Sequence, residues 1–367
     1  MTNLPKIIGL TGNIATGKSV VAQMLANSGG LEIDADVVAN RMLYPGAPAY
    51  QPVIEAFGDS ILTKNGKISR KKLGKVVFLD PKQLEKLEKI VHPEVSKSIK
   101  TRIEEASRSF VVIEAIKLLE SDLIEICDML WVSHASVTHQ MDRLLRTRNL
   151  SENDAKDRIQ AQPPQSEKLN RADVVINTEG SFKQTWQQIQ DGLANTMIGI
   201  ESLKRSTPVR SGDWYFPDVS AIPQDDAEIF WQSHAEKAPS DWYATLGSRI
   251  VLPALKEDQL EGLLLWDNWN FSAVFDRWIA NDQQRLSEKA ILDAFYQQIE
   301  QQECEVILFT IDKALKNSLF PAKIGFRKLM PDELPYPAWQ EAASKIIDDD
   351  EKIWIRFLKE PVEIIDK

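Results

Sequence analysis

The sequence has few cysteines and no long apolar run. Its two cysteines, Cys127 and Cys304, lie far apart without metal-ligand spacing, so we expect reduced thiols rather than a disulfide scaffold or zinc site. No apolar run reaches 18 residues, which argues against a membrane-spanning helix. The N-terminus lacks the apolar core of a signal peptide. We therefore expect a cytoplasmic protein that does not contact a membrane.

Positive charge is scarce in the second half of the chain. Residues 1–200 carry 25 Lys and Arg against 24 Asp and Glu, whereas the remainder carries 19 against 30. Eight of the ten tryptophans also follow position 200. An acidic surface opposes contact with phosphate backbones, so no nucleic-acid partner is expected. The break in composition indicates two domains, each long enough to bury a core of its own.

Short apolar runs of strand character alternate with helical patterns in the first half. This alternation predicts an α/β fold, with a parallel sheet flanked by helices, over residues 1–200. The strand-like runs span 7–11, 31–33, 109–116, 129–135 and 172–180.

The second half has a different order of elements. A stretch rich in Ser, Pro and charge at 201–212 reads as a linker. Residues 213–367 then predict a separate α+β domain, with a hairpin turn at 267–270. Its predicted strands span 248–255, 260–280 and 304–312, with a helix at 287–302.

The sequence GNIATGKS at 12–19 satisfies the P-loop pattern G-x-x-x-x-G-K-[ST], between a predicted strand and a predicted helix. Its glycines let successive N–H groups converge on a phosphate, and the following helix adds its positive end. Lys18 is placed to bridge the β- and γ-phosphates and Ser19 to ligate Mg²⁺. The front half is therefore expected to bind ATP. The predicted nucleotide site comprises Gly12, Asn13, Ile14, Ala15, Thr16, Gly17, Lys18, Ser19 and Val20.

Two further clusters qualify this site. Asp34 and Asp36 follow the second strand, where one carboxylate could accept a hydrogen bond from a substrate hydroxyl and the other hold Mg²⁺ through water. A helix N-cap is the alternative reading. Residues 140–162 read as a helix–turn–helix with several arginines, either a lid over the triphosphate or a solvated charged face.

An ordered set of motifs resembles the dephospho-CoA kinase family over residues 5–195. The resemblance implies transfer of the ATP γ-phosphate to the ribose 3′-hydroxyl of dephospho-CoA. It also implies a P-loop core with a helical substrate-binding region and a lid. The motifs are GNIATGKS, IDAD, NGKISRKKLGKVVF (65–78), LEKIVHPEV (87–95), LLE (118–120), QMDRLL followed by RIQAQ, and ADVVIN.

The resemblance assigns roles residue by residue. Catalytic roles fall to Lys18, Asp34 and Arg143, and the Mg²⁺ ligands are Ser19 and Asp36. The substrate is expected at Asp34, His92, Leu118 and Leu119, although His92 alone could equally be a helix cap. Asn177 is expected near the adenine, and Gln162 closes the lid.

The sequence also departs from the family pattern. Ile116 and Lys117 replace a proline and a leucine in the expected substrate wall, and Thr147 stands where a second lid arginine is expected. Two alternatives therefore stay open. One is a P-loop kinase for another small hydroxyl substrate such as a nucleoside, and the other is a nucleotide- or CoA-sensing module without turnover.

The second half is weakly similar to GNAT acyltransferases in its order of elements. The family's pyrophosphate-binding loop corresponds to residues 284–289, where Glu288 and Lys289 oppose close approach of a phosphate. An active module binding CoA or acyl-CoA and a degenerate, structural one are equally compatible with this sequence. Trp266, Trp269 and Trp278 could line a groove, but strand tryptophans more often belong to a core.

Overall fold

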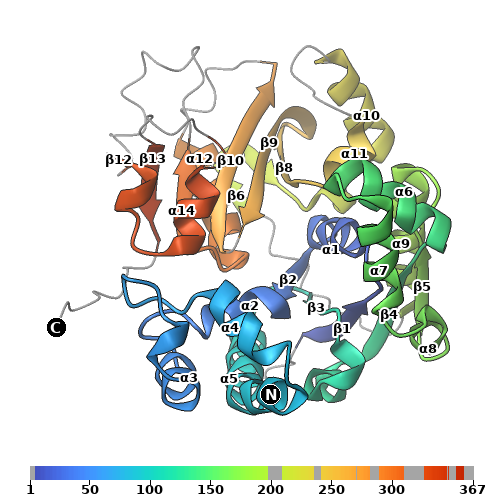
Figure 1. The fold of residues 1–367 in the computed structure, drawn as a ribbon. Helices are drawn as coiled ribbons and strands as arrows, with labels where there is room; N and C mark the ends of the chain where they lie inside the picture. The colour runs from blue at the N-terminus through green and yellow to red at the C-terminus, as the bar shows by residue number, and fades with distance from the viewer. Residues whose placement is uncertain are drawn as a thin grey trace.

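The computed structural model describes residues 5–196, 209–234, 241–269, 271–281, 289–309, 326–344, 346 and 353–358. The front half of the chain forms one α/β unit and the back half lies against it (Figure 1). None of the helices in these ranges is long and apolar enough to cross a membrane.

The front half contains a parallel sheet with strand order β2-β3-β1-β4-β5, which confirms the predicted fold class. β3 lies between β1 and β2, with Glu114 in register with both Leu10 and Asp34. The carboxyl ends of these strands therefore meet at one edge. The bounds are β1 (Lys6–Thr11), β2 (Gly30–Asp34), β3 (Phe110–Glu114), β4 (Met129–His134) and β5 (Val174–Asn177).

Helices cover both faces of this sheet. α1 (Lys18–Asn27) and α9 (Phe182–Thr196) pack on one face, and α2 (Ala35–Arg41) and α5 (Pro81–Glu105) pack on the other. α3 (Tyr50–Phe57) and α4 (Arg70–Val77) extend the helical region between α2 and α5. The predicted helix–turn–helix at 140–162 forms most of α6 (Val137–Arg148) and α7 (Glu152–Gln160), and the short helix α8 (Gln165–Leu169) follows it.

The described part of the back half contains a mixed sheet with strand order β12-β13-β11-β10-β9-β8-β7-β6. β10 and β11 are parallel, with α12 between them in the chain, whereas the other strand pairs described in this sheet are antiparallel. The strands are β6 (Val209–Ser211), β7 (Trp214–Phe216), β8 (Ile250–Lys256), β9 (Gln259–Trp269), β10 (Ser272–Ala280), β11 (Val306–Phe309), β12 (Arg327–Leu329) and β13 (Ile353–Phe357). The helices are α10 (Gln224–Ser233), α11 (Trp242–Leu246), α12 (Lys289–Gln301) and α14 (Pro337–Ser344).

Three expectations for the back half need comment. Val209–Ser211, expected in the linker, form strand β6, because they pair with Trp214–Phe216. The hairpin turn falls after Trp269, two residues later than predicted, because Asp267–Trp269 continue the pairing with β10. Of the 284–289 loop only Lys289 is among the described residues.

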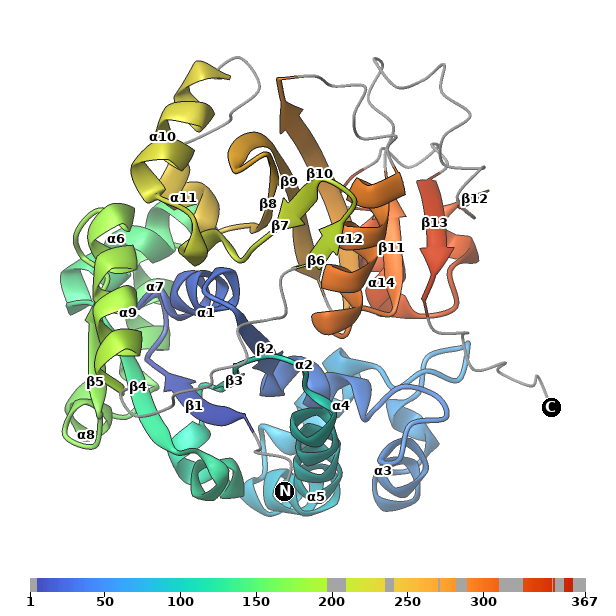
Figure 2. The same cartoon turned by 180° about the vertical axis from the view of Figure 1, so that it is seen from behind.

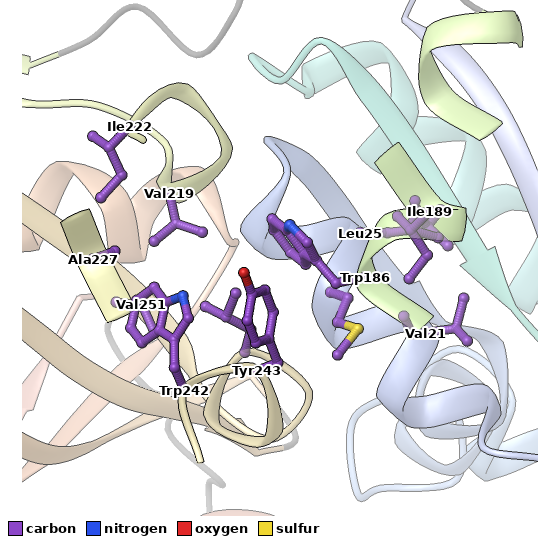
Figure 3. Close-up of a cluster of buried hydrophobic side chains, with 14 of the residues drawn as sticks. Val21, Leu25, Trp186, Ile189, Val219, Ile222, Ala227, Trp242, Tyr243 and Val251 are labelled. Atoms are coloured by element: carbon purple, nitrogen blue, oxygen red, sulfur yellow. The ribbon is translucent and has the colours of Figure 1, made fainter. Parts of the chain in front are cut away.

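The two halves share a hydrophobic core. Val21 and Leu25 of α1 and Trp186 of α9 pack in one cluster with Trp242, Tyr243 and Val251 of the back half (Figure 3). The view from behind shows α1 and α9 beside α10 and α11 (Figure 2). Asn27 adds hydrogen bonds to the backbone at Leu246 (2.8 Å), Arg249 (2.7 Å) and Val251 (2.9 Å). The expectation of a separate core for each half is therefore incomplete.

Candidate functional site

The P-loop joins β1 to α1 and has the backbone conformation its glycines predict. Gly17 is the N-cap of α1 with φ 80°, and Ala15 also has a positive φ of 58°. A Cβ on Gly12 would lie 2.2 Å from Ser133 Oγ, so no larger residue fits there. The loop thus brings its backbone to the positive end of a ten-residue helix, the arrangement that binds phosphate.

Lys18 forms an ion pair with Glu114 at the end of β3. Both side chains are nearly buried, and the exposed Ser19 hydroxyl lies 3.4 Å from the same Glu114 oxygen. Burial raises the pKa of Glu114, and the Lys18 ammonium opposes that shift. The sequence analysis quoted this strand but missed Glu114. The sequence did contain a signal for Glu114, because a carboxylate at the end of an otherwise apolar strand is a candidate for the functional edge of a parallel sheet.

Glu32 is a second acidic side chain that the sequence analysis did not single out. It lies on β2, two residues before Asp34. Burial, Glu114 and Asp34 all raise its pKa well above the ordinary value, and Asp267 of the back half adds to the effect. Glu32 is half-buried among acidic neighbours, so its charged form is less favourable than that of a free glutamate.

Asp34 and Asp36 occupy the edge where β2 passes into α2. Asp34 Oδ1 accepts hydrogen bonds from the N–H groups of Asp36 (2.8 Å) and Val37 (3.0 Å), so Asp34 is the N-cap of α2. The alternative reading of Asp34 as a helix N-cap is therefore confirmed, and the cap fixes the residue at the edge that carries the P-loop. Burial and the neighbouring Asp34 raise the pKa of Asp36.

A pocket of about 350 Å³ opens beside this edge. Asp36 of α2, His92 of α5 and Lys117 lie on its wall. His92 is in the middle of α5 and exposed, so the alternative reading as a helix cap is wrong. The residue types on the wall are mainly small or charged: Ala35, Asp36, Ala39, Glu88, His92, Val95, Ser96, Ala115, Lys117, Glu120, Ser121, Asp122 and Leu123.

The predicted substrate residues Leu118 and Leu119 are not on that wall. Leu118 is fully buried under β1, where a Cβ on Gly9 would lie 2.7 Å from its Cδ2. Leu119 packs partly buried against the same cluster. These leucines follow β3 in a 3-10 turn, Leu118–Glu120, which turns them inward and leaves Lys117 and Glu120 at the surface.

Side chains of α6, α8 and the residues before α8 form hydrogen bonds with the P-loop. Arg143 Nη1 donates to the Ala15 carbonyl (2.9 Å) and to Thr178 Oγ1 (3.0 Å). Gln162 Oε1 accepts the Ile14 N–H at 2.7 Å. Lys168, which the sequence analysis did not single out, donates to Asn13 Oδ1 at 2.9 Å and to the Ile116 carbonyl at 3.2 Å.

The remaining predicted positions lie around this core of the site. Asn177 ends β5 on the exposed rim, and its Oδ1 accepts the Glu179 N–H at 2.9 Å. The Val20 side chain packs against the shared cluster, where a Cβ on Gly247 of the back half would lie 2.8 Å from its Cγ1. Arg146, beside Thr147, pairs with Asp142 on the exposed face of α6.

The donor set at the edge fits a magnesium ion held together with phosphates. Among the described residues there is no cluster of three or more His, Cys, Asp or Glu side chains able to hold a metal ion alone. Mg²⁺ characteristically uses one or two carboxylates, waters and substrate phosphates, so such a cluster is not required. Ser19, Glu114 and Asp36 supply oxygen atoms of this kind.

Comparisons with known proteins found relatives of the front half and similar structures for the back half. The dephospho-CoA kinase family model matches residues 6–184. A dephospho-CoA kinase of Carboxydothermus hydrogenoformans is 44% identical over 186 residues, which cover 50% of this chain and 90% of that protein. The enzyme of the same name from Bacillus licheniformis is 41% identical, covering 53% of this chain and 98% of its own length. An acetyltransferase structure from Streptococcus agalactiae is similar over 40% of this chain and 100% of its own, at 15% identity and TM-score 0.28.

Proposed function

This chain belongs to the dephospho-CoA kinase family, and on that premise we propose that it transfers the γ-phosphoryl group of ATP to the ribose 3′-hydroxyl of dephospho-CoA. The products are coenzyme A and ADP. The proposal depends on one observation: a P-loop and the carboxylates of Asp34 and Glu114 lie at the same sheet edge, beside a pocket.

The front half supports the binding of ATP through its backbone. Gly17 and the first N–H groups of α1 offer donors to the phosphates, and Lys18 exchanges Glu114 for the β- and γ-phosphates. ATP supplies the phosphoryl group when it is bound. Glu114 holds the Lys18 ammonium close to the edge before that exchange, which reduces the motion needed.

Asp34 is proposed to orient the acceptor hydroxyl. Its Oδ1 is used by the α2 cap, and within the described ranges no hydrogen bond reaches Oδ2. That oxygen can accept the ribose O–H while the cap prevents the side chain from rotating. Because phosphoryl transfer has a loose transition state, alignment contributes more than deprotonation.

The pocket between α2 and α5 is proposed to hold the acceptor. His92 and Lys117 can meet the anionic groups of dephospho-CoA, and Asp36, which also lines the pocket, lies two residues after Asp34. We assign the Mg²⁺ ligands to Ser19, to Asp36 through water, and to Glu114. These residues place oxygen donors on the side from which the phosphates approach.

Arg143 and Gln162 are proposed to act on the P-loop rather than on the acceptor. Arg143 holds the Ala15 carbonyl and so supports a backbone conformation that alanine disfavours. Gln162 links the returning lid to Ile14. Closure of the lid over ATP would then exclude water from the phosphoryl group.

The test is a product analysis by mass. The purified full chain is incubated with Mg-ATP and dephospho-CoA, and the expected product is heavier by one phosphate. Parallel reactions with nucleosides as acceptors, and with no acceptor, separate the alternatives. Equal and slow ATP consumption with every acceptor would favour a binding module, and preferential nucleoside phosphorylation would favour another kinase.

We propose that the back half is a second domain that begins near Val209. We also propose that this domain binds CoA or acyl-CoA. The support is the β10–α12–β11 arrangement, in which a helix joins two parallel strands. Calorimetric titration of the full chain with CoA and with acetyl-CoA, in the presence of saturating ADP, tests it by stoichiometry, because the acceptor pocket of the front half can itself bind one CoA as the reaction product. Two CoA molecules bound per chain would support the proposal, whereas one or none would leave the back half a structural module.

A further inference from the structure

The turn between β9 and β10 places an aromatic ring between two arginines of the front half. Phe271 has φ 63°, a left-handed conformation in which hairpins usually place glycine. Its ring centroid lies 4.5 Å from the guanidinium carbon of Arg41 and 4.2 Å from that of Arg102. The residue is only 8% exposed. These contacts hold a bulky residue in a conformation that its own side chain disfavours.

Two carboxylates of the back half complete the contact. Glu305 accepts two hydrogen bonds from Arg41 Nη2, at 2.7 and 2.6 Å, and Glu303 pairs with Arg102. The Glu305 N–H donates to the Phe271 carbonyl at 2.7 Å, which fixes the turn to the strand beside it. Each arginine therefore lies between the ring and a carboxylate. We call these five residues the arginine clamp.

The clamp holds the two helices that line the acceptor pocket. Arg41 is the last residue of α2, the seven-residue helix that starts after Asp34 and carries Asp36. Arg102 lies in the last turn of α5, which carries His92. A helix about 10 Å long is not stable by itself, so its direction depends on what holds its two ends.

The two ends of α2 are held by different halves of the chain. The Asp34 cap holds its beginning at the sheet edge, and the clamp holds Arg41 at its end. Arg41 also suits this place electrostatically, because a cation is favourable at a helix C-terminus. A shift of the clamp would therefore move Asp36 relative to His92.

We propose that Phe271, through Arg41 and Arg102, is a positioning residue for the acceptor of the kinase reaction. This inference rests on the proposed function. The C. hydrogenoformans and B. licheniformis relatives are covered to 90% and 98% by 186 and 198 residues, so they have no room for a comparable back half. The back half of this chain thus supplies a support for the acceptor site that is additional to the kinase fold.

The experiment compares four full-length proteins: wild type, Phe271→Leu, Phe271→Tyr and Phe326→Leu. The leucine keeps an apolar side chain but removes the ring that faces both guanidinium groups, whereas tyrosine keeps the ring. Phe326 is an equally exposed phenylalanine, also 8%, in the core of the back half. Calorimetric dissociation constants for dephospho-CoA and ATP, together with KM and kcat, are measured for each protein.

The expected result is a KM and Kd for dephospho-CoA at least fivefold higher in Phe271→Leu, with the ATP constants within twofold of wild type. Phe271→Tyr and Phe326→Leu should both keep the KM and Kd for dephospho-CoA close to those of the wild type. Unchanged acceptor constants in Phe271→Leu, an equal loss for both substrates, or the same loss in Phe326→Leu would each overturn the inference.

Two further measurements keep the outcome clear. If Phe271→Leu does not fold, Glu305→Gln carries the same test, because it removes the charge facing Arg41 and keeps the side-chain size. A wild-type chain that binds ATP but not dephospho-CoA would instead overturn the proposed function, before any variant is compared.

Discussion

The Lys18 ammonium and the Glu114 carboxylate form a nearly buried ion pair that joins the first turn of α1 to the end of β3. Under the proposed function this pair has two states, because Lys18 would leave Glu114 to reach the phosphates. Nucleotide binding would then be connected with the protonation of a buried carboxyl group.

Lys18→Met is expected to lower kcat roughly 10²–10³-fold, the usual effect of losing one group that stabilises transition-state charge. Without the ammonium, the pKa of Glu114 rises further. Since ionising an unpaired buried carboxyl group is costly, the loss of stability should grow as the pH increases. Thermal unfolding at pH 5 and pH 8 measures this, with the exposed Lys89→Met as the control. An equal loss at both pH values would contradict it.

Glu32→Gln is expected to stabilise the protein at high pH. A raised folded-state pKa means that the folded state binds more protons than the unfolded state, so this contribution is present at low pH and is lost as the pH rises through the folded pKa. Glutamine cannot ionise and escapes that loss. We expect a gain in the free energy of unfolding at pH 8 and none at pH 4.

The matched comparison is Glu85→Gln, because Lys89 lowers the pKa of the Glu85 carboxyl. A lowered folded-state pKa contributes stability at high pH, which is lost as the pH falls. Glu85→Gln should therefore not stabilise the protein at pH 8. Chemical denaturation at both pH values gives the free energies of unfolding. A Glu32→Gln variant less stable than wild type at pH 8 would show that Glu32 is held in its charged form.

Asp34→Asn should separate folding from catalysis. Asparagine is as good an N-cap as aspartate, so α2 should begin normally and the ATP affinity should stay within twofold. Because the cap keeps the amide oxygen of asparagine, its NH2 group replaces Oδ2 and cannot accept the ribose O–H, so the acceptor loses its alignment and kcat should fall by about 10²-fold. Asp80→Asn, which changes the cap of α5, is the control. Loss of ATP binding in Asp34→Asn would remove the proposed role.

Arg143→Ala should weaken ATP binding at least about tenfold, because the Ala15 carbonyl and Thr178 lose the guanidinium that holds them together. Arg146→Ala is the matched control from the same helix. Arg146 is exposed and pairs only with Asp142 among the described residues, so its removal should change the ATP constants less than twofold. If Arg143→Ala and Arg146→Ala weaken ATP binding equally, the prediction is wrong, because the contact of Arg143 with the P-loop would then have no special effect on ATP binding.

The sequence predicted the parts of the site that have local signatures, and it missed the parts that depend on strand order. The P-loop spans eight consecutive residues, and the strand and helix beside it confirm its context. Glu114 and Glu32 could not be assigned in the same way, because their proximity depends on β3 lying between β1 and β2. Leu118 was placed at the pocket from a motif, but the turn after β3 directs it into the core.

The relation between the halves was also beyond sequence reasoning. Asn27 bonds to residues more than 200 positions away, and nothing in its local sequence marks it as a contact residue. The tryptophans of the back half predicted a hydrophobic core. They did not show whether each one packs within the back half or against the front half. Trp266 and Trp278 are buried in the back half's own cluster, whereas Trp242 belongs to the cluster shared with α1.

Trp242→Ala should therefore destabilise both halves together. Trp242 is 1% exposed in the shared cluster, so the substitution should cost about 3–5 kcal/mol. Scanning calorimetry of the wild type should show a single unfolding transition. ATP should raise the temperature of that entire transition, although it binds only the front half. The variant should show one transition at a lower temperature. Two wild-type transitions, of which ATP shifts one and Trp242→Ala shifts the other, would mean that the halves unfold independently despite their common core.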